Sequence, residues 1–160
     1  MRTSPNTIPG LILLVTVAIL SSAYSAQYIG GLQPCILCLY GRIPWFLTGG
    51  LMLVTILMQF TGPLRRTILM IAALALFVGA GISGYHVGVE KGIFQPPSTC
   101  SATTMPGSLE ELKALMDTAV APRCDEVQWE MFGITLAGYN ALASLAMALA
   151  ALAGVRWGRR

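Results

Sequence analysis

Four apolar stretches, each long enough to cross a bilayer, constrain this chain more than any other feature. They cover residues of about 8–26, 43–60, 67–85 and 132–155. At 1.5 Å per residue each forms a helix of roughly 27 Å or more, which matches a bilayer core. Backbone N–H and C=O groups must pair internally in lipid, so such stretches form helices. The sequence therefore predicts an all-α membrane protein, a four-transmembrane-helix bundle within a single domain over 1–160.

The composition agrees with a lipid environment. The chain is 55% hydrophobic and only 11% charged, whereas soluble domains carry about a quarter charged residues. The net charge of +3 is small and scattered, so no nucleic-acid partner is expected. Three tryptophans lie near predicted span ends, where aromatic side chains anchor helices at the membrane surface. They are Trp45, Trp129 and Trp157.

The distribution of basic residues predicts the orientation, because short cytoplasmic loops are enriched in Lys and Arg. Arg2, the pair Arg65–Arg66 and the tail Arg156–Arg160 flank the predicted spans. Both termini are therefore expected in the cytoplasm, and the loops of about 27–42 and 86–131 on the opposite side. All four cysteines lie in those two loops, on the side where disulfides persist.

Two segments carry signals of their own. The first apolar stretch also resembles a secretory signal peptide, with Ala23–Ala26 as a small-residue cleavage site. Cleavage there would leave the topology of the remaining chain unchanged. In the long loop, Ser108 and Glu111 form a capping box that predicts a short amphipathic helix to about Ala121, of a kind that lies in the membrane interface.

Cys35 and Cys38 form a C-x-x-C pair directly after Pro34. Proline favours the first position of a helix, which would place Cys35 in the first turn. Free N–H groups and the helix dipole stabilise a thiolate there, so a redox-active pair is the favoured interpretation. The alternatives are a structural disulfide and half of a metal site. A structural zinc site uses four ligands, and the chain has no second close cysteine pair, so no metal is expected.

Two polar residues accompany this pair at the edge of the membrane. Arg42 follows Cys38 by four residues and shares its helix face. Charges in or beside spans are costly and usually functional, so we expect Arg42 to stabilise a Cys38 thiolate or to hydrogen-bond the head group of a ligand. Snorkelling to the interface is the alternative. His86, the lone histidine, serves either proton transfer or a plain interfacial hydrogen bond.

Cys100 and Cys124 enclose the predicted amphipathic helix. A disulfide between them would brace that segment, which is a sufficient structural reason for it. The functional alternative is an exposed, exchangeable disulfide beside a mobile Pro96–Pro97 approach, because exchange needs access for an attacking thiolate. Four cysteines permit three pairings, and the residues alone do not choose among them.

Three segments resemble one known family. Residues 33–42, QPCILCLYGR, resemble the motif that opens the second span of the DsbB disulfide bond formation proteins. Residues 124–133, CDEVQWEMFG, are similar to the stretch leading into that family's last span, and residues 85–90 to the end of its third. A C-x-x-C alone is weak evidence. The extended motif with Arg42, a distant second cysteine pair and four spans together cover nearly the whole chain.

The resemblance implies a quinone-linked thiol oxidase of the bacterial inner membrane, with its cysteines on the periplasmic side. Cys100 and Cys124 would accept electrons from a periplasmic DsbA-like, thioredoxin-fold oxidase, with Cys100 as the sulfur attacked. The electrons would pass to Cys35 and Cys38, and then to ubiquinone or menaquinone from the membrane quinone pool. The residues implied to face the quinone are Cys38, Arg42 and His86.

The sequence departs from the family pattern in one place, and two other functions are compatible with it. The entry to the fourth span, residues 134–140, lacks the proline found in many family members, which affects packing rather than the redox centre. Within redox chemistry, the alternative is a reductant-exporting thiol carrier or a protein similar to vitamin K epoxide reductase. From another class, the alternative is a non-catalytic tetraspan scaffold with two structural disulfides.

Overall fold

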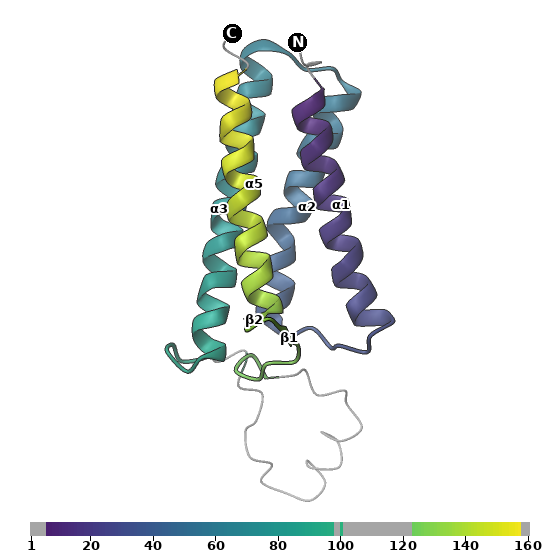
Figure 1. The fold of residues 1–160 in the computed structure, drawn as a ribbon. Coiled ribbons are helices and arrows are strands. Elements are labelled where there is room, and N and C mark those ends of the chain that lie inside the picture. Colours follow the sequence, from purple (N-terminus) through teal and green to yellow (C-terminus); the bar gives the residue numbers. More distant parts are fainter. Residues whose placement is uncertain (1–5, 98–99, 101–122, 158–160) are drawn as a thin grey trace, which may run out of the picture.

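The computed structural model describes residues 6–97, 100 and 123–157, and within these ranges it contains four long helices. The helices are α1 (Thr7–Tyr28), α2 (Ile36–Leu57), α3 (Gly62–Glu90) and α5 (Leu136–Trp157). All four are long and apolar enough to cross a membrane. They stand side by side as one bundle (Figure 1). The predicted four-helix membrane bundle is confirmed.

The start of α1 and the end of α5 lie at the same end of the bundle (Figure 1). The opposite end carries the connections that follow α1 and α3, and a short antiparallel hairpin of β1 (Glu130–Met131) and β2 (Ile134–Thr135). Phe132 and Gly133 both have positive φ, of 53° and 76°, which is the backbone of a tight hairpin turn whose twist matches the strands. This hairpin end carries the cysteines.

The helices begin and end at different residues from the predicted spans. α2 begins at Ile36, before the apolar span of about 43–60 and near the helix start expected at Pro34, and α3 extends to Glu90 rather than 85. His86 therefore lies inside α3 and not in the expected loop, whereas Arg42 lies on the helix that carries Cys38, as expected. Residues 132–135 form the hairpin turn and second strand, so α5 begins later than the fourth predicted span. The amphipathic helix expected over 108–121 lies outside the described residues.

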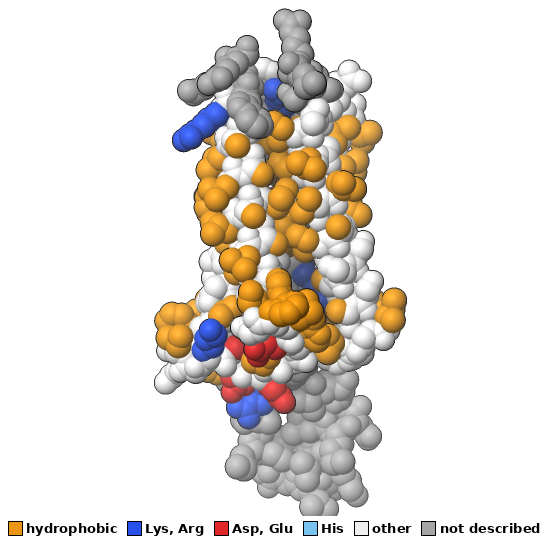
Figure 2. All heavy atoms as spheres, in the orientation of Figure 1, with side chains coloured by type: hydrophobic (Ala, Val, Ile, Leu, Met, Phe, Trp, Pro, Cys, Tyr) orange, Lys and Arg blue, Asp and Glu red, His pale blue; other side chains and the backbone are white. Residues whose placement is uncertain are grey.

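The bundle core lies between α2, α3 and α5. α3 packs most extensively against α5 and α2, and α1 packs mainly against α2. Small side chains in the core let the helix backbones approach closely, as is usual in membranes. The fully buried core residues include Ile12, Trp45, Met52, Leu69, Ala72, Leu76, Ala148 and Ala151. Hydrophobic side chains cover the middle of the outer face, and acidic side chains gather at the hairpin end (Figure 2).

Trp45 belongs to this core and is only 1% exposed, so its predicted role as a surface anchor is wrong. Its Nε1 donates a hydrogen bond to Asn140 Oδ1 at 2.8 Å. Asn140 Nδ2 in turn donates to Ser83 Oγ at 2.7 Å. This chain ties α2 to α5 and α3, and it satisfies the polar group that makes a buried tryptophan costly. Trp129, which is 38% exposed beside the hairpin, is the better candidate for an anchor.

A close approach between α2 and α3 gives a stability prediction. A Cβ added to Gly79 would lie 3.0 Å from both Cβ and Cγ of Pro44, a rigid ring inside α2, whereas a Cβ at Gly81 meets nothing within 4 Å. Gly79→Leu should therefore lower the free energy of unfolding by about 1–3 kcal/mol through overpacking. Gly81→Leu is the matched control and should unfold like the parent in detergent. Equal stability of the two variants would contradict this packing.

Candidate functional site

The C-x-x-C pair is built into the start of α2. Cys35 is the N-cap, with φ −71° and ψ 170°, and its Sγ accepts a hydrogen bond from the Cys38 backbone N–H at 3.3 Å. An N-cap side chain normally satisfies the N–H at this third helical position. The prediction that Pro34 occupies the first helical position is wrong. Pro34 precedes the N-cap, and Ile36 is the first helical residue. Cys38 lies one turn along the same helix.

The two sulfurs are free thiols held 3.0 Å apart, with Cys38 Sγ hydrogen-bonded to Cys35 Sγ. The hydrogen bond from the Cys38 side chain is the main cause that lowers the pKa of Cys35, to about 4, and a hydrogen bond with His86 adds to it, while burial opposes both. Cys35 is 2% exposed. The pair thus consists of a stabilised thiolate at Cys35 and a proton-bearing donor at Cys38.

This arrangement predicts how Cys35 reacts with an alkylating agent. Only the thiolate reacts, and an ordinary thiol with a pKa near 8.5 loses about tenfold in rate per pH unit below that value. In the reduced protein, alkylation of Cys35 by a small reagent should stay nearly constant from pH 8 down to about pH 5. Mass spectrometry after timed quenching measures it.

Two variants of Cys38 provide the control. Cys38→Ser keeps an O–H donor for the Cys35 thiolate, and Cys38→Ala removes it. The midpoint of alkylation should move to higher pH by a unit or more in Cys38→Ala and by less in Cys38→Ser. An ordinary thiol profile in the unmodified protein would contradict the N-cap geometry.

His86 and Glu90 approach the pair from the last turn of α3. His86 Nε2 lies 3.5 Å from Cys35 Sγ and 3.8 Å from Glu90 Oε1. Glu90 Oε2 accepts a hydrogen bond from the Thr135 hydroxyl at 2.6 Å. The sequence placed His86 correctly near the pair but did not identify Glu90 or Thr135. The available signal was the spacing of four between His86 and Glu90, which puts them on one helix face.

The structure pairs Cys100 with Cys124 in a disulfide, with a Cα–Cα distance of 5.6 Å. This resolves the three possible pairings. Both sulfurs pack in one buried cluster with Cys35, Leu37 and Val89. Cys100 is 7% exposed and Cys124 is 1% exposed, so the disulfide is buried rather than exposed as the functional alternative expected. The burial follows from its packing against the start of α2 and the end of α3.

Arg42 lies half-buried on α2 and is held from α1. Its guanidinium donates to Gln27 Oε1 at 2.8 Å and more weakly to the Ala23 carbonyl at 3.5 Å. It also lies over the Tyr24 ring, 5.0 Å from the centroid, a cation–π arrangement. These contacts go to α1, whereas the sequence favoured Cys38 or a ligand as partner. They fix the position of the guanidinium while leaving further N–H donors for a ligand.

A cavity of about 290 Å³ lies between the helices next to Cys38. Its polar lining includes Cys38, Arg42 and His86, and its walls are mostly apolar. The apolar and aromatic lining includes Ile19, Leu20, Leu37, Trp45, Leu136, Ala137 and Ala143. A smaller recess of about 40 Å³ adjoins the same three polar residues and also reaches Cys35 and Glu90. An apolar chamber with a few convergent polar groups is typical of a small-ligand site.

The same cluster contains potential metal ligands. Donor atoms of Cys35, Cys38 and His86 all lie within 4.8 Å of one another. Three donors are one fewer than a closed zinc site uses. The hydrogen bond between the two sulfurs accounts for their separation without an ion, so we interpret the cluster through thiol chemistry.

A membrane bundle in which a free C-x-x-C pair packs against a second, disulfide-bonded pair defines a membrane protein of thiol–disulfide chemistry. The family model described as "Disulfide bond formation protein DsbB" matches residues 5–154. The chain therefore belongs to the DsbB family, a family of bacterial membrane proteins that act in disulfide bond formation.

Named relatives agree with this assignment. The chain is 31% identical over 152 residues to "Disulfide bond formation protein B" of Shewanella amazonensis, covering 90% of this chain and 86% of that protein. It is 26% identical over 160 residues to the protein of the same name in Nitrosococcus oceani, covering 95% and 92%. An uncharacterized protein of Rickettsia prowazekii is 28% identical over 141 residues, covering 85% and 80%. No solved structure matches the chain.

Proposed function

We propose that this protein is a quinone-dependent thiol oxidase that works as one membrane domain, residues 1–160. It reoxidises a periplasmic thioredoxin-fold dithiol oxidase and passes the electrons through two cysteine pairs to ubiquinone or menaquinone. The observation that carries the proposal is the continuity of the site. The Cys100–Cys124 disulfide and Cys35 share one buried cluster, and Cys38 continues from that cluster into the cavity.

The outer pair reacts first. A thiolate of the dithiol partner attacks Cys100, which is the more exposed of the two sulfurs, and Cys124 leaves as a thiolate. The partner's second thiol then displaces Cys100 from the mixed disulfide. The partner leaves oxidised, and Cys100 and Cys124 carry its two electrons as thiols. Because both cysteines are largely buried, the partner must gain access to Cys100 before it can attack.

The inner pair takes the electrons next. A thiolate of the reduced outer pair attacks a Cys35–Cys38 disulfide across their shared cluster, and a second exchange restores the Cys100–Cys124 disulfide. The inner pair is then the dithiol. The N-cap position favours thiolate at Cys35, and a good thiolate is also a good leaving group in the exchange that reduces this pair.

The cavity fits a quinone by its chemistry. Its walls are apolar and aromatic, as a quinone ring requires, and Arg42 supplies N–H donors at the polar side. When bound there, a quinone accepts the two electrons and two protons that the dithiol loses. Cys38 lines the cavity and delivers the electron pair, while Cys35, 3.0 Å away, closes the disulfide with it. His86 lies 3.5 Å from Cys35 Sγ and takes its proton.

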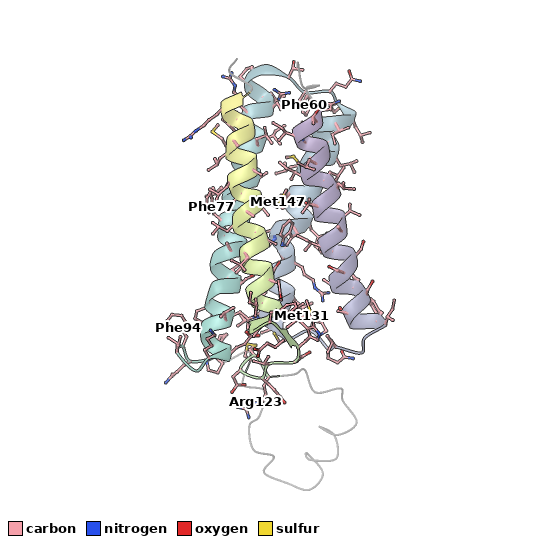
Figure 3. All side chains as sticks on the ribbon, viewed as in Figure 1. Phe60, Phe77, Phe94, Arg123, Met131 and Met147 are labelled. Carbon is pink, nitrogen blue, oxygen red and sulfur yellow. A yellow bond between two sulfur atoms is a disulfide. The ribbon has the colours of Figure 1, made fainter. Side chains whose placement is uncertain are left out.

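The orientation in the membrane is part of this proposal. Arg65 and Arg66 lie near the start of α3, at the end of the bundle where α1 begins and α5 ends (Figure 1). Basic residues favour the cytoplasm, so that end faces the cytoplasm and the hairpin end faces the periplasm of a bacterial inner membrane. Acidic side chains gather at the hairpin end (Figure 2), and Arg123 lies there too (Figure 3). Its Nη2 donates a hydrogen bond to Asp125 Oδ2 at 2.7 Å.

A reconstituted reaction tests the proposal. Purified protein in detergent is mixed with a reduced thioredoxin-fold dithiol protein and a soluble ubiquinone analogue. The absorbance of the quinone should fall in a one-to-one ratio with partner oxidation. Quinone reduction that does not depend on the added dithiol would overturn the proposal. Net reduction of an oxidised partner by quinol would favour the reductant-exporting alternative instead.

A further inference from the structure

Glu90 is a buried carboxylate to which the proposed mechanism gives no role. It ends α3, and only 6% of its side chain is exposed. A buried carboxylate is unfavourable unless charged or hydrogen-bonded partners surround it, and in membrane proteins such a group is usually functional. Its two oxygens have different partners, one at the end of β2 and one on its own helix.

The first partner is Thr135, which fixes the carboxylate from outside α3. The Thr135 hydroxyl accepts a hydrogen bond from Gly138 N–H at 3.2 Å as the N-cap of α5. Its single proton is therefore directed to Glu90 Oε2, at 2.6 Å. A short bond of this kind to a charged oxygen is among the stronger hydrogen bonds in proteins. One hydroxyl thus starts α5 and anchors Glu90.

The second partner is His86. Glu90 Oε1 lies 3.8 Å from His86 Nε2, and the same nitrogen lies 3.5 Å from Cys35 Sγ. The same ring nitrogen therefore lies next to both an anchored carboxylate and the sulfur that must lose a proton. His86 also lines the cavity next to Cys38, so a proton on the ring is adjacent to the place where an acceptor binds.

Other charged groups surround His86 from the neighbouring elements. Cys35, Cys38 and Arg42 face it from α2, Glu126 lines the small recess from the segment before β1, and Tyr139 lines the cavity from α5. The part of α1 that lines these spaces contributes no titratable side chain. Within the described ranges, Glu90 is the carboxylate that contacts the ring, since the Glu126 residue is exposed.

We propose that Glu90, anchored by Thr135, is a positioning residue that keeps His86 between Cys35 and the cavity and balances the charge that His86 gains. This inference rests on the proposed function. As Cys35 becomes a thiolate, its proton resides on His86, beside the Glu90 carboxylate. When Cys35 and Cys38 close their disulfide, two electrons go to the quinone. The proton on His86 and the proton of Cys38 go to the two quinone oxygens, which gives the quinol.

The test replaces Glu90 with glutamine, which keeps the shape and the hydrogen bond from Thr135 but removes the charge. The first measurement needs no quinone: the pH dependence of Cys35 alkylation in the reduced protein. Without the carboxylate, His86 is less able to stay protonated, so Cys35 loses a charged partner. The alkylation midpoint should move up by about one pH unit. An unchanged or lower midpoint overturns the inference.

The second measurement separates the two halves of the reaction. Single-turnover quinone reduction by the reduced Glu90→Gln protein should be at least about tenfold slower near neutral pH, the scale expected for impaired proton transfer. Exchange of a small dithiol with the Cys100–Cys124 disulfide should keep its rate. Equal slowing of both steps would indicate a merely structural role and overturns the inference.

Matched variants complete the experiment. Glu130→Gln makes the same charge change on the exposed strand β1 and should leave the midpoint in place. Thr135→Val removes the anchor and should move the midpoint in the same direction as Glu90→Gln, whereas Thr135→Ser should restore it. In a His86→Ala background, Glu90→Gln should add no further shift, because coupled residues are not additive. A further shift in that background overturns the inference. If Glu90→Gln reduces quinone normally and shows no midpoint shift, the inference fails while the proposed function stands.

Discussion

Replacing Cys38 with serine should abolish quinone reduction while the protein still inserts as a four-helix bundle. Cys38 is the sulfur that lines the cavity, and Cys35 has no other thiol within the C-x-x-C pair with which to close a disulfide. The rate of quinone reduction should fall by roughly three orders of magnitude or more, as is typical when a reacting nucleophile is removed. Serine differs from cysteine by one atom at a half-buried position, so packing should be nearly unaffected.

The outer disulfide provides the internal control for this result. In Cys38→Ser, the Cys100–Cys124 disulfide should still oxidise one equivalent of a dithiol partner and then stop. Mass spectrometry of the protein and its mixed disulfide with the partner, after a single turnover without quinone reduction, measures this stoichiometry. A non-catalytic scaffold predicts the opposite pattern: altered thermal stability with unchanged partner oxidation. Continued turnover in Cys38→Ser would exclude the relay.

The positions of the helices follow from the sequence because lipid leaves few alternatives. A long apolar stretch must form a helix, and its length is set by the bilayer. The ends are harder to predict, because polar groups near the surface are satisfied by specific partners. Cys35 illustrates this: cysteine is not among the usual N-cap residues, yet its sulfur accepts the Cys38 N–H and α2 begins there. Pro34 was the stronger signal, but it lies two residues before the first helical residue, Ile36.

The sequence predicted most residues of the site but not the contacts between them. Cys35, Cys38 and Arg42 share one short motif. The structure places Cys38 and Arg42 around one cavity with His86, and Cys35 lines the recess that adjoins it. Glu90 was missed because the apolar stretch ends near residue 85, whereas the helix continues to Glu90. The continuation brings the carboxylate beside His86 and Thr135, two contacts that no periodicity reveals. Burial of the outer disulfide is likewise a property of tertiary packing.

Trp45 shows the same limit in the core. Its place near the start of a predicted span suggested an interfacial anchor, because tryptophan is enriched there. The true helix begins earlier, at Ile36, so Trp45 lies deeper in the bundle than the sequence indicated. Its partner Asn140 comes from α5, 95 residues along the chain. A long-range hydrogen bond of this kind cannot be read from local pattern.

Arg42→Ala should weaken the use of quinone far more than it slows the first exchange at Cys100. Arg42 lines the cavity, while the outer disulfide packs in a different cluster. A hydrogen bond from a charged donor contributes about 1.5–3 kcal/mol, so kcat/KM for a soluble quinone should fall by roughly 10- to 150-fold. Stopped-flow reduction of the quinone and single-turnover oxidation of the partner give the two rates.

The variants at this position distinguish charge from geometry. Arg42→Lys keeps the charge but loses the planar fork that donates to Gln27 and to a ligand at once, so it should recover only part of the activity. Arg156→Ala, an exposed arginine in the last turn of α5 at the opposite end of the bundle, should leave both rates unchanged. Equal losses in both steps for Arg42→Ala would show that the residue supports the fold. A selective loss places the electron acceptor beside Cys38, because Arg42 and Cys38 line one cavity from the same face of α2.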